Sequence, residues 1–355
     1  MKILDRYIAT RVLVMILLVA FALLGLDIVF TLVQELSAMG KGGYDFATVL
    51  TVVLLQMPTK IYFMFAWSGL IGSLLALGIF AKHNELIVMQ TAAVSVSRIA
   101  IAVVKAAIIV TLLAAIVGEV IAPLTDKLAQ RIRATAISNG TAIGTLYGNW
   151  FRVNNDFVHV GMITPDNILK NIKIYKFNAD RTLQQIKHAR VASKNSENIW
   201  QLRDVQIVTI HAAKTTQTTK KILELTELVN VDLLREVRVK HLDRISFVSL
   251  LRAIKYRAAN NLSTVAYDIA VWSKLCKPLA IVVMILLGVP FVFGPLRGTT
   301  IGVKILVGIL VGFSFHTINA LFAPIAVVYS VPAYMAASMP ILLFAGVGLW
   351  LLRRV

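Results

Sequence analysis

The fold of this chain is decided by its first apolar stretch, residues 12–33, which reads VLVMILLVAFALLGLDIVFTLV. Its 22 residues include a single charged side chain, Asp27. A helix rises about 1.5 Å per residue, so about 20 residues cross the roughly 30 Å hydrocarbon core of a bilayer. The stretch is also longer than the apolar region of a cleaved signal peptide, which has about 7 to 15 residues. We therefore predict a transmembrane helix that is retained.

Five more apolar stretches of comparable length follow it. They lie at residues 53–81, 99–122, 275–293, 303–323 and 331–352. Hydrophobic residues make up 58% of the chain, charged residues 15%, and the mean hydropathy is +0.77, which together exclude an ordinary soluble domain. The single cysteine, Cys276, excludes an intrachain disulfide and a thiolate zinc site. The sequence predicts an integral membrane protein with six spans.

The polar residues gather between the third and fourth spans. Residues 124–264 hold 22 Lys and Arg and 11 Asp and Glu, whereas the other 214 residues hold 14 and 7. We therefore expect three parts. These are three helices in residues 1–123, a polar inserted domain in residues 124–264, and three more helices in residues 265–355.

Inside the polar domain, apolar residues recur at period two, which is typical of β-strands. Short strands are predicted near residues 150–153, 157–160, 172–177, 183–191, 200–210 and 220–229. Such a succession without helical patterns between the strands favours an antiparallel sandwich. The flanks, residues 125–138 and 246–259, are expected to be helices that link this domain to the membrane.

Lys and Arg near the ends of the spans predict the orientation. Ten of them lie in the short flanks on the side of the two termini, and four lie in the short flanks on the opposite side. The excess places both termini in the cytoplasm and the polar domain outside it, in the periplasm of a two-membrane cell. A net charge of +18 suggests nucleic acid or anionic lipid as a partner, and the hydropathy favours lipid.

Motifs for nucleotide hydrolysis and for metal chemistry are absent from the sequence. The glycine-rich run at residues 40–43 lacks the spacing and the hydroxyl of a phosphate-binding loop. No H-E-x-x-H or G-x-S-x-G motif occurs, and the six histidines are scattered. We expect no enzymatic activity, no metal site and no cofactor in this chain.

One cytoplasmic segment carries a more specific pattern. Residues 82–90, KHNELIVMQ, mix ion-pairing groups with a compact apolar set. This suits a short helix that docks in a groove of a cytoplasmic partner. The alternative is a helix at the membrane interface with Glu85 facing water, and the spacing alone does not separate the two.

Several motifs in this order resemble those of the LptF/LptG permease family, over residues 4–354. They are Leu4-Asp5-Arg6-Tyr7-Ile8, Asn84-Glu85-Leu86-Ile87-Val88-Met89-Gln90, Gly118-Glu119, Ala122-Pro123, Trp272-Ser273-Lys274 and Phe293-Gly294-Pro295-Leu296-Arg297. The first and the last of these are closer to the LptG branch than to the LptF branch.

The resemblance implies a permease subunit of an ABC exporter that extracts lipopolysaccharide from the inner membrane. Its expected partners are an LptF-type permease, a dimer of an LptB-type ATPase, and LptC-type and LptA-type periplasmic proteins. ATP and magnesium would be used by the ATPase, and the polar domain would be a β-jellyroll. Two other classes remain as alternatives: a membrane-anchored periplasmic binding or scaffold protein, and a secondary transporter.

The resemblance also implies site residues. A coupling helix within residues 82–97 would contact the ATPase, and the coupling residues would be Glu85, Leu86, Met89 and Arg297. Phe313 would line an acyl-chain cavity, and His316 would either line it or hydrogen-bond between helices.

Lipopolysaccharide carries phosphates, so its site needs a cationic rim at the outer surface of the membrane. Lys41, Lys60, Arg131 and Arg133 are the candidates for this rim. The alternative is that these side chains anchor the helix ends among lipid headgroups.

The family pattern is not matched everywhere. Lysines of related proteins correspond here to Thr31, Ser37, Ala38 and Thr59. The phosphate clamp is therefore either weakened or rebuilt from other residues.

Ionisable and small residues inside the spans each have alternative interpretations. A cavity or a subunit contact would satisfy Asp27 and Glu119, and so would protonation or nearness to the interface. Small residues permit close helix approach. We expect the following small residues to mark the contact with the second permease or a lateral gate: Gly69, Gly72, Ser73, Gly78, Gly302, Gly308 and Gly312.

Overall fold

The computed structural model describes residues 2–137, 143–153, 156–164, 168–178, 180, 182–195, 199–210, 214–225, 242–296, 298–329 and 331–354. Six helical segments in these ranges are long and apolar enough to cross a membrane, as the sequence predicted. They are α1 (Lys2–Leu36), α2 (Phe46–Lys82), the segment that begins with α4 (Val96–Ile116), α8 (Val265–Phe293), α9 (Ile301–Val328) and α10 (Ala333–Arg353).

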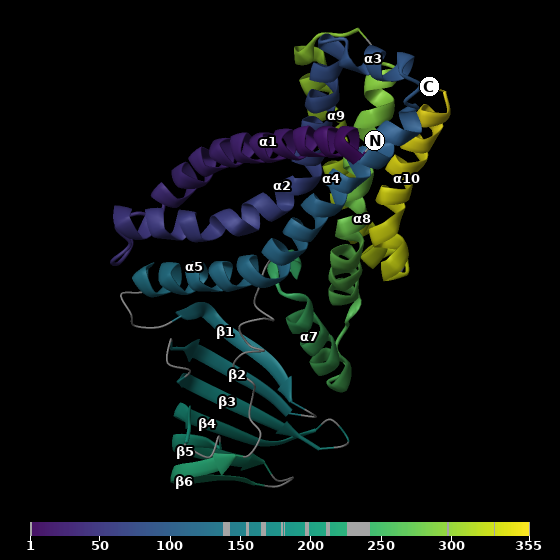
Figure 1. Ribbon diagram of the computed structural model, residues 1–355. Coiled ribbons are helices and arrows are strands. Elements are labelled where there is room, and N and C mark those ends of the chain that lie inside the picture. Colours follow the sequence, from purple (N-terminus) through teal and green to yellow (C-terminus); the bar gives the residue numbers. More distant parts are fainter. Residues whose placement is uncertain are drawn as a thin grey trace.

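Both termini lie at one end of the α8–α10 bundle, and the β-sheet lies toward the opposite end (Figure 1). We call these ends the terminus side and the sheet side. The short helix α3 (Glu85–Thr91) joins the second and third spans on the terminus side. The helix α7 (Phe247–Ala259) returns the chain from the polar insert to α8.

The third span is not a single regular helix. After α4 the chain passes through a π-helical turn, η1 (Val117–Ile121), and continues as α5 (Ala122–Ile137). The helix predicted for residues 125–138 is therefore the direct continuation of the span. Figure 1 shows α5 lying above β1, so the same segment leaves the membrane bundle and covers the first strand.

The turn between α1 and α2 is set by glycine and by a helix cap. Gly42 has φ +61°, and a side chain there would meet the Ile137 carbonyl oxygen at 2.5 Å. The Asp45 carboxylate accepts a hydrogen bond from the Thr48 backbone N–H at 2.9 Å and so caps α2. Its hydrogen bonds with Thr48 lower the pKa of Asp45 below its usual value. The charged form, which caps best, therefore dominates at neutral pH.

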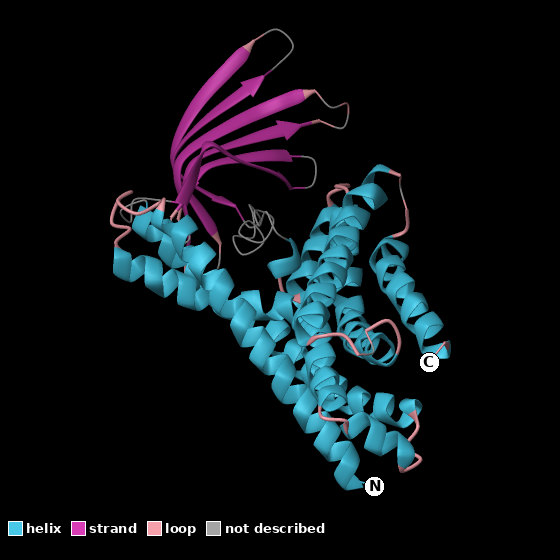
Figure 2. Cartoon of the chain, turned by 90° about the horizontal axis from the view of Figure 1, so that it is seen from above, coloured by secondary structure: helices cyan, strands magenta, loops and turns pink. Residues whose placement is uncertain are grey.

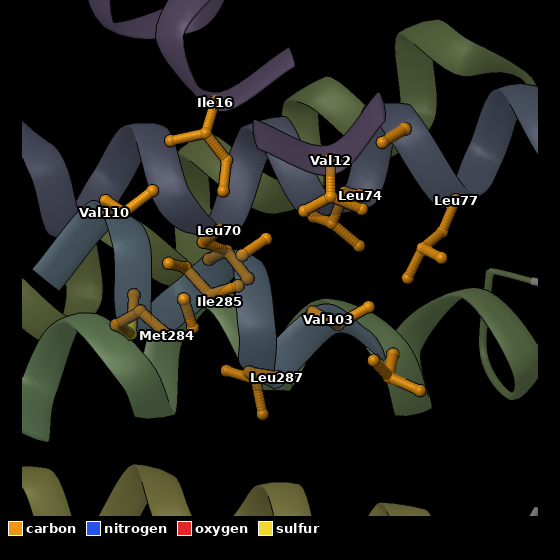
Figure 3. Packing of buried hydrophobic residues seen from close by; sticks show 14 of the residues in the cluster. Val12, Ile16, Leu70, Leu74, Leu77, Val103, Val110, Met284, Ile285 and Leu287 are labelled. Atoms are coloured by element: carbon orange, nitrogen blue, oxygen red, sulfur yellow. The ribbon is translucent and has the colours of Figure 1, made fainter. Parts of the chain in front are cut away.

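The largest apolar core is built around α2. Side chains of α1, α2, α4 and α8 interdigitate in it, including Ile16, Leu70, Leu74, Val103 and Met284 (Figure 3). Glycines bring the backbones together, because a β-carbon on Gly72 would lie 2.5 Å from Ile16 Cα. Packing of this kind holds helices together in lipid, where water supplies no driving force between them.

The small residues of the second span face helices of the same chain. A side chain at Gly69 would meet Ile285 of α8, and one at Gly78 would meet Lys304 of α9. Gly308 likewise faces Ile71 of α2. These glycines therefore allow close helix contacts within the chain, and their expected place at the contact with a second permease or at a lateral gate stays a prediction. Gly302 has open space around it.

The polar insert forms an antiparallel sheet of six strands in chain order. The strands are β1 (Ile143–Val153), β2 (Asp156–Ile163), β3 (Leu169–Phe177), β4 (Leu183–Lys194), β5 (Trp200–Ile210) and β6 (Thr215–Leu225). Figure 2 shows them as one curved layer beside the helices. β1 and β6 are the edges of this layer, so the described strands do not close into a barrel.

One face of the sheet is apolar. Val158, Ile172 and Leu202 are fully buried in a cluster of their own, and alternate residues such as His159 and Lys173 point to the other face. The antiparallel sheet and five of the six predicted strands are confirmed, although β1 begins earlier than predicted. The sixth was placed at 220–229, whereas β6 ends at Leu225, and residues 226–229 lie outside the described part of the chain.

We predict that Gly72→Ala destabilises the helix bundle by about 1–3 kcal/mol, the usual cost of overpacking a core. The added methyl group meets backbone atoms of Ile16, which cannot move aside as a flexible side chain would. Thermal unfolding in detergent measures the change. Gly25→Ala is the matched control, because nothing lies within 4 Å of a β-carbon there. Equal unfolding temperatures for the two variants would contradict the proposed close contact.

Candidate functional site

On the terminus side, α3 presents two different faces. Leu86 and Met89 are buried, at 4% and 8% exposure, and belong to the core shared with α1, α2, α4 and α8. Ile87 and Val88 are exposed at 51% and 63%. The predicted coupling residues Leu86 and Met89 therefore seat the helix on its own chain. The exposed apolar side chains of α3 are Ile87 and Val88, which the sequence analysis did not assign to coupling, and Gln90 and Thr91 are exposed as well.

Glu85 begins α3 and is connected to the start of α1. The Tyr7 hydroxyl donates a hydrogen bond to its carboxylate at 3.1 Å. The Tyr7 ring also packs on Phe80 of α2, with 5.5 Å between ring centroids. The fourth predicted coupling residue, Arg297, lies outside the described residues. Glu85 thus joins α3 to α1 as well as facing solvent.

On the sheet side, Lys60 of α2 forms an ion pair with a carboxylate of α1. Its ammonium lies 2.9 Å from the Asp27 carboxylate and donates to the Thr31 hydroxyl at 3.0 Å. Thr31 in turn donates to Asp27 at 3.1 Å. The intramembrane Asp27 is therefore satisfied by a cation of the same chain.

A second pair of this kind lies near the end of α1. The Arg133 guanidinium of α5 lies 2.8 Å from the Glu35 carboxylate, and the Tyr44 hydroxyl donates to the same carboxylate at 3.0 Å. Burial, and then the hydrogen bond to Glu35, raise the pKa of Tyr44 to about 12. Tyr44 therefore remains a neutral donor at physiological pH. Lys41 and Arg131, by contrast, are exposed and make no ion pair among the described residues.

The two aromatic candidates of α9 lie in different surroundings. Phe313 is 58% exposed on the surface of the chain. The His316 ring meets Trp67 of α2 edge to face, with 5.2 Å between centroids, and lines a cavity of 640 Å³. Lys274 and Lys277 of α8 line the same cavity. The sequence analysis used Lys274 as part of a family motif and Lys277 only to count charges, although two cations three residues apart at the start of an apolar stretch were a usable signal for a site.

Glu119 lies where three segments meet. Its carboxylate accepts from the Lys274 ammonium at 2.5 Å and from the Phe247 backbone N–H at 2.9 Å. It therefore connects the π-helical turn η1 to α8 and to the first turn of α7. Lys274 is 6% exposed and Glu119 is 38% exposed, so the pair lies at the edge of the protein interior. The interactions within the chain satisfy Glu119.

The sequence model of one protein family, described as lipopolysaccharide export system permease LptF/LptG, matches residues 6–354. The chain belongs to this family. It is 33% identical to the lipopolysaccharide export system permease protein LptG of Escherichia coli K12, over 99% of this chain and 98% of that protein. It is 34% identical to the LptG protein of Haemophilus influenzae, with the same coverage. The predicted resemblance, including its preference for the LptG branch, is confirmed.

The four residues that replace lysines of the LptF/LptG pattern make contacts within the chain or are buried in it. Thr31 bridges Lys60 and Asp27, and the buried Thr59 donates to the Ala122 carbonyl at 3.4 Å. Ser37 donates to the Gln34 carbonyl at 2.6 Å, and Ala38 is buried. The polar positions among them therefore hold neutral groups, and the nearby cations Lys60 and Arg133 are both paired with carboxylates of α1.

We predict that Glu119→Gln lowers the free energy of unfolding by about 1–3 kcal/mol, because it leaves the Lys274 ammonium buried without a counter-ion. The effect is smaller than the roughly 3–5 kcal/mol of a fully buried pair, since Glu119 is partly exposed. Thermal unfolding of the single variant and of Glu119→Gln/Lys274→Met measures it. The double variant recovers most of the loss, and failure to recover would contradict the assignment of the loss to the unpaired Lys274 ammonium.

Proposed function

We propose that the chain is the LptG-type permease subunit of an ABC exporter that extracts lipopolysaccharide from the inner membrane and passes it toward the outer membrane. The observation that carries this proposal is the match to LptG proteins over nearly the full length of both chains. The three-plus-three arrangement of spans around an antiparallel insert supports it. A permease of this type performs no chemistry itself, and ATP with magnesium is used by the partner ATPase.

The proposed orientation places the terminus side in the cytoplasm and the sheet side in the periplasm. The ten-to-four distribution of Lys and Arg in the short flanks supports this. Residues 1–123 and 265–355 then form the membrane-embedded halves, and residues 124–264 form the periplasmic domain with its helical links. Among the described strands, β1 and β6 form the edges of the sheet, and such edges suit the addition of strands from LptC-type and LptA-type neighbours.

We propose that the exposed face of α3 docks on an LptB-type ATPase dimer. Ile87 and Val88 supply the apolar contact, Glu85 supplies the charge, and Leu86 and Met89 hold the helix on the core. Arg297, which lies outside the described residues, is assigned to coupling on the family motif alone. Because Tyr7 joins Glu85 to α1, a displacement of α3 is transmitted to the first span.

At the other end of α1, the same displacement would change the cationic rim. α1 has 35 residues and is therefore about 52 Å long, enough to connect the two membrane surfaces. Its carboxylates Asp27 and Glu35 neutralise Lys60 and Arg133 in this structure. When α1 moves away, these cations become free to bind the phosphates of lipopolysaccharide. Lys41 and Arg131 extend the rim, and Phe313 and His316 contact acyl chains.

We predict that Glu85→Ala abolishes co-purification of the ATPase from native membranes, whereas Tyr7→Phe retains it. Alanine removes the charged contact, while phenylalanine keeps the ring on Phe80 and loses only the hydroxyl. In reconstituted vesicles, the Tyr7→Phe complex then hydrolyses ATP but releases less lipopolysaccharide per ATP. If the wild-type protein retains no ATPase, the exporter role fails and a scaffold or a secondary transporter takes its place.

We predict opposite effects for the two members of the Lys60 pair. Lys60→Gln lowers the lipopolysaccharide retained by the purified complex by about three- to tenfold, the range for one partly solvated charge-assisted hydrogen bond. Asp27→Asn retains at least the wild-type amount, because the carboxylate that competes with phosphate is gone. Quantifying lipid phosphate per complex measures both. Equal losses in the two variants would indicate a purely structural ion pair.

A further inference from the structure

One face of the sheet carries aromatic rings where water would favour polar side chains. The apolar cluster of the sheet occupies the opposite face, because side chains alternate along each strand. The rings lie on the neighbouring strands β1, β2 and β3 (Figure 1). We call the following five residues the aromatic patch: Trp150 of β1, Phe157 and His159 of β2, and Tyr175 and Phe177 of β3.

The rings of the patch contact one another across the strands. Trp150 lies 4.9 Å from His159 and 5.4 Å from Tyr175, measured between ring centroids, and the planes of Trp150 and Tyr175 differ by only 28°. The backbones of β1 and β3 are about 10 Å apart, since β2 lies between them, so these two rings lean over β2 to meet. Phe157 and Phe177 form a second contact at 5.6 Å.

Two rings of the patch are well exposed. Trp150 is 58% exposed and Phe157 is 40% exposed, whereas the other three residues are half-buried. The outward face of an antiparallel sheet is usually polar, and an exposed apolar patch usually marks a binding surface. The sheet also lies outside the six candidate membrane spans, so lipid does not account for the exposed rings.

The charged side chains beside the rings are cationic. Lys173 pairs with His159 across β2 and β3, and the Arg152 guanidinium lies 5.7 Å from the centroid of the Phe157 ring. Asp156 is the one acid among the described residues of β1–β3. It directly precedes Phe157 and therefore belongs to the opposite face. The patch thus combines aromatic rings with positive charge, which suits an anionic ligand.

The exposed area indicates a small ligand. An aromatic side chain has about 150–250 Å² of surface, so the exposed parts of Trp150 and Phe157 amount to about 200 Å² together. A stable protein interface covers about 800 Å² on each partner. The patch is therefore too small for such an interface by itself, whereas it is wide enough for a few sugar rings.

Phosphorylated sugars have the chemistry that this surface would recognise. One face of a pyranose ring carries C–H groups, which pack on the negative face of an aromatic ring and leave the hydroxyls at the edge for hydrogen bonds. A phosphate on the sugar forms charge-assisted hydrogen bonds with lysine or arginine. An acyl chain, by contrast, gains nothing from the cations.

We propose that the aromatic patch binds phosphorylated sugars of lipopolysaccharide, with a sugar ring on Trp150 and a phosphate on Lys173. Phe157 and Arg152 extend the site along the first hairpin of the sheet. The proposal rests on the proposed export function, whose cargo carries such sugars. It adds a subsite on the inserted domain to the cationic rim near α1, and this subsite would hold the sugar region of the cargo beside the sheet.

Photo-crosslinking maps the site. The probe is fully deacylated lipopolysaccharide, which keeps its phosphates and carries a diazirine on a glucosamine amine that deacylation frees. The purified permease complex in phosphatidylcholine nanodiscs is irradiated with this probe and digested for mass spectrometry. Label is expected on the peptides of β1–β3 that contain Trp150, Phe157 and Tyr175.

The variants separate the ring from the charge. Trp150→Ala is expected to lower this labelling about three- to tenfold, the range for one aromatic contact, and Trp150→Phe retains most of it. Lys173→Gln lowers it about three- to tenfold. Ile222→Ala and Lys221→Gln, at exposed positions of β6, are the matched controls and leave it unchanged. Thermal unfolding confirms that each variant is folded.

Removing phosphate from the probe tests the assigned contact. The dephosphorylated probe is expected to label the wild-type sheet about three- to tenfold less. Lys173→Gln then changes its labelling little, because both changes remove the same interaction. An equally large further loss in Lys173→Gln would contradict the contact between Lys173 and the phosphate.

Three outcomes overturn the proposal as a whole. They are equal labelling of wild type and Trp150→Ala, label confined to peptides of α1, α2 and α5, and loss of a co-purifying protein in Trp150→Ala while the labelling is unchanged. The export function is scored separately, by the intact lipopolysaccharide that co-purifies with the wild-type complex. If this lipid is retained while the patch takes no label, only the sugar subsite fails. If it is not retained, the export function fails and the subsite with it.

Discussion

The close contact of α2 with its neighbours is the constraint on which the rest of the structure depends. In a bilayer, apolar side chains gain nothing by leaving lipid for protein, so helices must associate through tight van der Waals packing and polar contacts. Gly72 and Gly69 supply the packing toward α1 and α8. Because α2 is held in this way, its Lys60 meets Asp27 and its Tyr62 meets Lys277.

The charges follow from the same packing. One cation on each of α2, α5 and α8 meets an acid on another segment, and the three pairs are Lys60 with Asp27, Arg133 with Glu35, and Lys274 with Glu119. Each pair joins two different helical segments, so a relative movement of these segments changes which charges are neutralised. The number of unpaired cations on the sheet side therefore depends on the arrangement of the spans, and so does the attraction of this side for an anionic lipid.

Much of the fold and part of the site could be predicted from the sequence. Span length and strand alternation are local properties, so the six helices and most of the strands were recognisable. Which segment a given residue packs against, by contrast, depends on residues that are distant in the sequence. The sequence predicts a contact with a second permease or a lateral gate at the glycines of α2, and a contact with the ATPase at Leu86 and Met89. Their packing within the chain was not predicted, because small and apolar residues look alike whether they pack inside a chain or between chains. Lys277 was missed because its aromatic neighbours lie more than 200 residues away.

The π-helical turn η1 makes the third span sensitive to length as well as to composition. It accommodates one residue more than a regular α-helical turn would, and everything beyond it is oriented by that extra residue. Loss of one residue between 117 and 121 would rotate α5 by about 100°, since an α-helix has 3.6 residues per turn. Arg133 would then turn away from Glu35 and Ala129 from its buried site, although no residue of α5 had been altered.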